Sequence, residues 1–117
     1  MSFNLEDYEP VQDRIKKFYD KYPDGRIITV IDKMTNTGVI FKAMLFKNIE
    51  DQKALSPLST GYAFERPGEG YVNKTSWLEN CETSSIGRAL ANIGMHGDKR
   101  ASREEMEKVQ NDIQNTQ

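Results

Sequence analysis

The segment from residue 73 to residue 94 constrains the fold of this chain more than any other. Its apolar residues recur mostly at steps of three and four, which predicts a helix with one apolar stripe. The stripe consists of Leu78, Cys81, Ile86, Ala89, Leu90 and Ile93. Small residues such as Gly87 and Ala91 stand between them, although a glycine inside a helix costs about 1 kcal/mol relative to alanine. We therefore expect another backbone to pass close to this helix, and Gly94 to end it in the left-handed conformation.

The residues before this helix predict a second helix followed by three strands. The second helix begins near Pro10, which suits a first turn, and an apolar face follows it. That face consists of Val11, Ile15, Phe18, Tyr19 and Tyr22. The strands are expected over 26–33, 39–47 and 60–66, with a polar connection over 48–59. The residues Thr35-Asn36-Thr37-Gly38 are a hairpin signal because Asn and Gly can take positive φ.

The order of these elements predicts the fold class and the domain organisation. We expect an α+β protein with an N-terminal helix, a three-stranded, largely antiparallel β-meander, a long packing helix and a short C-terminal helix. Residues 1–95 should form a single domain, and residues 96–117 a linker and the last helix. Ser102-Arg103-Glu104-Glu105 is a capping-box pattern that would begin this helix. Its apolar stripe is thin, so we expect it to fray alone or to dock on another subunit.

Composition and charge limit the setting in which the chain works. Its 117 residues suit one domain, and no run approaches the ~20 apolar residues of a membrane helix. The acidic start lacks the apolar core of a signal peptide, and the single cysteine has no partner for a disulfide. A reducing cytoplasm fits these features best. Residues 26–100 carry ten Lys or Arg against eight Asp or Glu, between two acidic ends, which permits nucleic-acid binding without requiring it.

The residue inventory argues against an enzyme. The one histidine, His96, lies in a glycine-flanked linker, so no Ser-His-Asp or Cys-His arrangement is evident. There is no phosphate-binding loop and no clustered metal-ligand set, so we expect no cofactor and no metal. Cys81 lies on the apolar stripe, which favours a buried structural thiol over a nucleophile. Glu79 and Glu82 are one helical turn apart and fit a solvated helix face better than an acid–base pair.

A distributed binding surface remains. Cations that follow a backbone and aromatic rings on which bases stack are what a single-stranded nucleic acid needs. The candidate residues are the cations Lys33, Lys42, Lys47, Arg66, Lys74, Arg88, Lys99 and Arg100 and the aromatics Tyr62, Phe64, Tyr71 and Trp77. The plain alternative is that these charges are merely solvated and that some aromatics fill the core, which is the favoured reading of Trp77.

Two segments carry a resemblance to a known family. Asn73-Lys74-Thr75-Ser76 with residues 78–94, and Phe3-Asn4-Leu5 with residues 22–28, are similar to small proteins of actinobacterial phages. That group in turn resembles the phage single-strand annealing superfamily, which includes the essential-recombination-function and Red-beta-like proteins. The resemblance implies a three-stranded meander followed by a long helix, binding of single-stranded DNA, homo-oligomeric rings or filaments, and no nucleotide cofactor. Lys74 and Arg88 lie within the matching segment and are the positions that it carries over.

The sequence thus predicts an oligomeric single-stranded DNA-binding protein that anneals strands in phage recombination or replication. Its expected partners are single-stranded DNA, further copies of itself, and a phage exonuclease or replication protein, but no membrane. Gly87→Leu is expected to disrupt assembly, because Gly87 and Ala91 would permit close helix packing. Two alternatives stay open, a five-stranded OB barrel that binds single strands and a protein-interaction factor without direct DNA binding.

Overall fold

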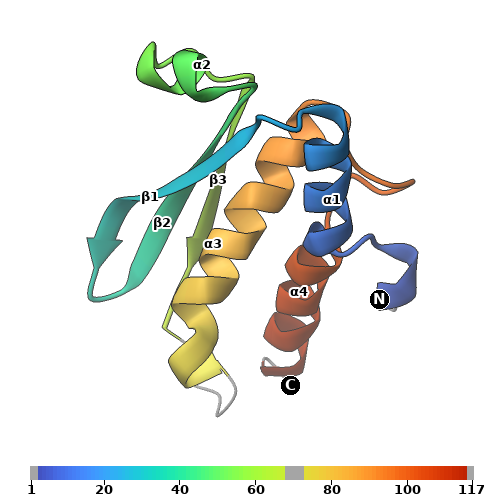
Figure 1. The fold of residues 1–117 in the computed structure, drawn as a ribbon. Helices are drawn as coiled ribbons and strands as arrows, with labels where there is room; N and C mark the ends of the chain where they lie inside the picture. The colour runs from blue at the N-terminus through green and yellow to red at the C-terminus, as the bar shows by residue number, and fades with distance from the viewer. Residues whose placement is uncertain (1–2, 68–72, 116–117) are drawn as a thin grey trace.

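A computed structural model describes residues 3–67 and 73–115 of the chain, with side chains placed over 3–67 and 76–110. It has the predicted α+β architecture (Figure 1). The elements in chain order are the 3-10 helix η1 (Leu5–Asp7), α1 (Val11–Lys21), β1 (Arg26–Thr35), β2 (Gly38–Phe46), α2 (Ile49–Lys53), β3 (Ser59–Glu65), α3 (Asn73–Asn92) and α4 (Arg103–Asn115). None of the described helices is both long enough and apolar enough to cross a membrane.

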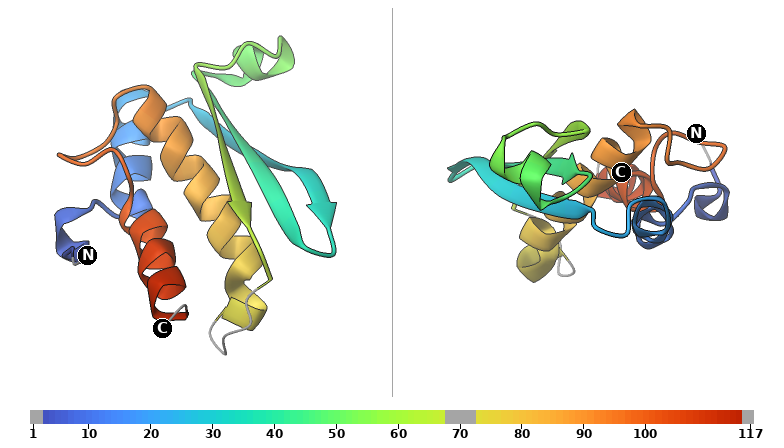
Figure 2. Two further views of the ribbon diagram at one scale, coloured as in Figure 1. Left: turned by 180° about the vertical axis from the view of Figure 1, so that it is seen from behind. Right: turned by 45° about the horizontal axis from the view of Figure 1, so that its top comes forward.

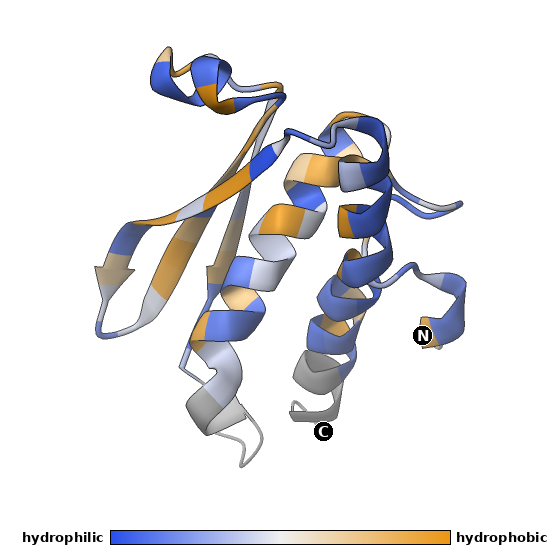
Figure 3. Cartoon of the chain, in the orientation of Figure 1, coloured by the Kyte–Doolittle hydropathy of each residue, from blue (hydrophilic) through white to orange (hydrophobic). Residues whose placement is uncertain are grey.

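The sheet is a β-meander in which β2 lies between β1 and β3 and both pairings are antiparallel. Helices α1, α3 and α4 all lie on one side of this sheet, with α3 running directly across it (Figures 1 and 2). Between its buried ends, Gly38 and Phe46, β2 shows the alternation that the period of a strand requires: Val39, Phe41, Ala43 and Leu45 are buried and face the helices. The hydrophobic colouring of β2 and of one side of α3 follows this interface (Figure 3).

Two clusters of buried side chains form the core between the sheet and the helices. One joins Phe18 of α1 to Ala43 and Leu45 of the sheet and to Ala89 and Leu90 of α3. The other joins Val39, Phe41 and Cys81, with Trp77 and Leu78 packed against it. The predicted apolar stripe of the long helix is therefore the surface that packs on the sheet.

The backbone that passes close to α3 is that of β3. A Cβ atom added to Gly61 would lie 2.4 Å from the amide nitrogen of Ala89 and 2.6 Å from the carbonyl oxygen of Ser85. The expectation drawn from the small residues of this helix is confirmed. So is the predicted helix end, because Gly94 takes a φ of +79°.

Gly87 has an intrachain partner, which changes the reading of this position. A Cβ atom there would lie 2.8 Å from Cγ2 of Val11 on α1 and 3.4 Å from Oγ of Ser102. The close packing that this glycine permits is with α1 and the segment before α4. Gly87→Leu would therefore perturb the fold of a single chain before it reached any contact between subunits.

Arg14 is the fully buried centre of a hydrogen-bond network that the sequence reading missed. Its guanidinium donates to Oε1 of Glu9 at 3.3 Å and to the carbonyl oxygen of Gly87 at 3.0 Å. The same group donates to three consecutive carbonyl oxygens, those of Lys99, Arg100 and Ala101, at 3.0–3.3 Å. One side chain thus joins α1 to α3 and to the segment that leads into α4.

The last helix begins with the predicted capping box. The amide of Ser102 donates to Oε1 of Glu105, and the amide of Glu105 donates to Oγ of Ser102, both at 3.3 Å. The side chain of Arg103 then donates to the carbonyl oxygens of Leu5 and Tyr8, and the amide of Val11 donates to Glu104. These bonds dock the start of α4 on the N-terminal segment of its own chain. The boundary expected at residue 95 stays a prediction.

Three local features differ from the sequence prediction. The polar connection over 48–59 contains a short helix that was not predicted, α2, which Asn48 caps by accepting a hydrogen bond from the amide of Asp51. The hairpin turn uses no positive φ, because in the described backbone only Leu55 and Gly94 take one. The five-stranded barrel is wrong, since the described part of the chain forms a three-stranded sheet backed by helices.

Candidate nucleic-acid interface

Helices α1, α3 and α4 leave one face of the sheet uncovered, and we call it the open face (Figure 2). Its residues follow from the pairing register, since directly paired residues share a face and neighbours along a strand alternate. Beyond the pair Arg26 and Phe46 at the strand ends, where Phe46 is buried, the open face consists of Ile28, Val30 and Lys33 of β1, Ile40, Lys42 and Met44 of β2, and Thr60, Tyr62 and Phe64 of β3. Two large aromatic rings and two lysines therefore share it.

Each aromatic ring of the open face has a cation beside it. Nζ of Lys42 lies 5.7 Å from the ring centroid of Tyr62, its register partner on β3. The guanidinium carbon of Arg66 lies 5.8 Å from the ring centroid of Phe64. Tyr62 is 48% exposed and Phe64 is 45% exposed. Cations within about 6 Å of exposed rings can contact phosphates while the rings stay available for stacking.

A shallow hollow of about 540 Å³ extends the open face at the hairpin end. Phe64, Arg66 and Pro67 line one side of it, and Asn36 and Thr37 of the β1–β2 turn line the other. The sequence reading used these turn residues only as a hairpin signal. Their place in the site follows from the antiparallel register, which brings the end of β3 beside that turn.

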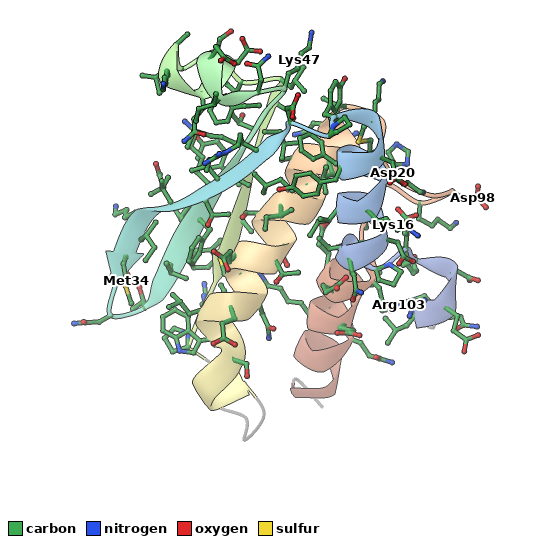
Figure 4. All side chains as sticks on the ribbon, in the orientation of Figure 1. Lys16, Asp20, Met34, Lys47, Asp98 and Arg103 are labelled. Carbon is green, nitrogen blue, oxygen red and sulfur yellow. The ribbon has the colours of Figure 1, made fainter. Side chains whose placement is uncertain are left out.

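The remaining strand-associated cations lie at opposite ends of the sheet. Lys33 is exposed and pairs with Ile40 near the hairpin tip, which Met34 marks in Figure 4. Lys47 follows β2 at the other end, beside α2 (Figure 4). Lys42 and Arg66 therefore lie beside the two rings and Lys33 shares their face, whereas Lys47 lies apart from them.

Three predicted cations lie on the helical side. Arg88 on α3 forms an ion pair with Glu105 of α4, with Nη1 and Oε2 3.2 Å apart. Arg100 donates to the carbonyl oxygen of Ala91 at 3.3 Å and also to the side chain of Asn92. Lys99 is exposed in the same segment. The structure does not bring these three together with the open face.

Trp77 also lies on the helical side, where it packs against Val39, Phe41 and Cys81. The structure therefore supports the interpretation of Trp77 as a core-packing residue. It does not place Trp77 with the rings of the open face. Tyr71 lies outside the described residues, and so does the side chain of Lys74.

The side chains considered above as catalytic candidates, Cys81, Glu82 and His96, each have a hydrogen-bond partner within the chain. The thiol of Cys81 is buried and donates to the carbonyl oxygen of Ala63 at 3.3 Å, and burial raises the pKa of this thiol. Glu82 accepts a hydrogen bond of 2.6 Å from the hydroxyl of Thr29. His96 is half-buried, with Nδ1 2.7 Å from the carbonyl oxygen of Gly97. Over the described residues, no three Cys, His, Asp or Glu side chains gather as metal ligands.

Comparison with known families gives a match whose description names a nucleic-acid-binding domain. Residues 15–93 match the family described as Slr1353 N-terminal dsRNA-binding domain-like. The chain belongs to this family. The matched region includes most of α1, the whole sheet and α3 through Asn92, and therefore all of the open face. No curated protein and no solved structure matches the chain.

Proposed function

We propose that this protein binds single-stranded nucleic acid on the open face of its sheet. The observation that carries the proposal is the pair of half-exposed rings, Tyr62 and Phe64, each with a cation within 6 Å. Bases stack on such rings whatever their sequence, and Lys33, Lys42 and Arg66 neutralise the adjoining phosphates. The dsRNA-binding-like family supports nucleic acid as the ligand class.

The finer form of the proposal comes from the resemblance to phage annealing proteins. In that form the ligand is DNA, and the protein acts without catalysis or a cofactor. It anneals strands during recombination or replication, as an oligomer in the bacterial host cytoplasm and together with a phage exonuclease or replication protein. Binding on the open face is needed for each of these steps, so it is the first property to test.

Binding should depend strongly on salt. A fluorescent oligo-dT titrated with the protein at rising salt should give a straight line of log affinity against log salt concentration. Its slope is expected to be about −0.7 for each phosphate neutralised on a single strand. Three neutralised phosphates would thus give a slope of roughly −2. A protein with no affinity for oligonucleotides in dilute buffer would contradict the proposal and favour the protein-interaction alternative.

Phe64→Ala is expected to weaken oligo-dT binding by about 1–3 kcal/mol, the usual effect of losing one stacked base. The salt slope should stay unchanged, because no cation is removed. Tyr19→Ala is the matched control, since Tyr19 is 41% exposed but lies on α1, away from the open face. Fluorescence anisotropy measures both variants, and an equal loss in the two would argue against stacking on the open face.

Duplex RNA is the second candidate ligand, and the family description favours it. Proteins of the dsRNA-binding class recognise the shape of the A-form helix through 2′-hydroxyl and phosphate contacts. Such contacts need cations and polar groups but no exposed rings. A protein that bound duplex RNA more tightly than oligo-dT or single-stranded RNA, and whose Phe64→Ala variant bound it normally, would support this candidate over ours.

A further inference from the structure

The two outer edges of the sheet are not equally protected. On β3, the side chain of Asn92 donates to the carbonyl oxygen of Thr60 at 2.8 Å, and that of Lys108 donates to the carbonyl oxygen of Phe64. An ion pair of 3.1 Å between Lys108 and Glu65 fixes α4 against this edge. The outer edge of β1 has no element beside it in the described part of the chain (Figure 1).

The first part of β1 is suited to pairing with another strand. Residues 26–31 are Arg-Ile-Ile-Thr-Val-Ile, a run with high β-propensity and one charge. Val30 and Ile31 are 41% and 48% exposed and point to opposite faces. The regular register ends in a bulge between Ile31 and Lys33. A bulge and a lysine are common means of blocking an edge, so they limit the open stretch to residues 26–31, with Asp32 as the extra residue of the bulge at its end.

We propose that β1 pairs antiparallel with β1 of a second copy. The two-fold axis that relates the copies lies midway between their two Thr29 residues. Such an axis is perpendicular to the sheet and keeps each residue on its own face. One residue must therefore lie opposite its own symmetry mate.

With Thr29 opposite its own mate, Arg26 lies opposite Asp32, the residue of the bulge, in the second copy, and the reverse pair forms as well. Ile27 then lies opposite Ile31, and Ile28 opposite Val30. Cross-strand pairs of opposite charge and of β-branched residues both stabilise antiparallel strands. Moving the axis by one residue places Arg26 opposite Val30 or Met34 and loses both charge pairs. Charge complementarity thus selects the register.

The pairing makes one six-stranded sheet whose two open faces lie on the same side. The two sets of rings would then lie on the same side of this sheet, one near each outer edge, because β3 is the outermost strand of each copy. A chain of copies joined from β1 to β3 is disfavoured, because side chains from α3 and α4 cover the β3 edge. Joining β1 to β1 uses the same edge on both copies, so the assembly closes as a dimer.

A charge-reversal cycle tests the register. Arg26→Asp and Asp32→Arg should each weaken the dimer about tenfold in sedimentation equilibrium, because each replaces two opposite-charge pairs by two like-charge pairs. The double variant, R26D/D32R, should restore it to within about threefold of the wild type. Circular dichroism checks that each variant is folded. If the dimer affinity of the double variant fell by the combined loss of the two single variants, the register would be wrong.

Symmetry provides a second test, because Thr29 would face its own mate. Thr29→Cys should form a disulfide-linked dimer under mild oxidation, since facing Cα atoms in antiparallel strands are about 4.5–5.5 Å apart. Lys33→Cys is the matched control, because its two copies would be about 26 Å apart, eight positions at 3.3 Å each. The buried Cys81 of the unmodified protein should not cross-link. A monomeric wild type at millimolar concentration, or equal cross-linking of the two variants, would overturn the proposal.

The proposed β1 pairing and the proposed nucleic-acid function can be disproved independently. A monomer that binds oligo-dT would overturn the β1 pairing and leave the proposed function intact. A dimer that binds no oligonucleotide would do the reverse.

Discussion

Arg14→Met is expected to lower the free energy of unfolding by about 3–5 kcal/mol, the usual cost of removing one partner of a buried ion pair. Methionine has a similar length but no donors. Glu9 and the carbonyl oxygens of Gly87, Lys99, Arg100 and Ala101 would each lose a hydrogen bond. Domains of this size are stable by about 5–15 kcal/mol in all, so this one change removes a large share. Thermal unfolding followed by circular dichroism should show a midpoint roughly 10–20 °C lower.

Lys17→Met is the control for the Arg14 prediction. Lys17 also pairs with Glu9, at 2.5 Å, but its side chain is 50% exposed. An ion pair of this kind contributes less than about 1 kcal/mol. The two variants thus remove a cation from the same carboxylate in different surroundings. Equal destabilisation would mean that the carbonyl network of Arg14 contributes nothing beyond the ion pair.

The position of Arg14 could have been read from the sequence. It lies three residues after Val11 and four before Phe18, on the face that the apolar residues of α1 define. A charged residue on such a face is either exposed by a local irregularity or buried with partners. The five acceptors could not have been foreseen, because four of them are backbone oxygens of residues more than 70 positions away.

The fold could be predicted from the sequence because its local patterns each indicate one kind of secondary structure. The β-branched run before Lys33, the hairpin signal and the alternation of Tyr62 and Phe64 suffice for a meander. The short helix α2 was missed because its five residues are too few for a periodic pattern, and only the cap at Asn48 signals it. The docking of α4 was missed because Arg103 and Glu104 bind backbone groups that have no distinctive sequence.

The candidate site was predicted as a residue set without a geometry. Alternation correctly placed Tyr62 and Phe64 on one face, and the register then added Lys42. Arg88 and Trp77 could not be assigned to a side, because a helix crossing a sheet exposes some residues and packs others according to its rotation. The structure fixes that rotation through Gly61, where the strand and the helix touch.

Gly61→Ala tests this contact and is expected to cost about 2–3 kcal/mol of unfolding free energy, within the usual range for overpacking. The added methyl would meet the backbone of Ala89 at 2.4 Å and of Ser85 at 2.6 Å, and neither can rotate away. The strand and the helix would have to separate. Hydrogen bonds of 2.8 Å from Ser59 to the carbonyl oxygen of Ala89 and from Asn92 to that of Thr60 resist such a movement.

Gly97→Ala makes the same chemical change where there is room for it. A Cβ atom there lies 3.6 Å from Cβ of Glu9, an ordinary contact, and Gly97 takes no positive φ. Its effect should stay within about 0.5 kcal/mol, as for most surface substitutions. Urea unfolding of the two variants isolates the cost of the close approach from the general effect of replacing glycine. If Gly61→Ala were as stable as Gly97→Ala, β3 and α3 could not be in backbone contact, and the open face would have to be assigned again.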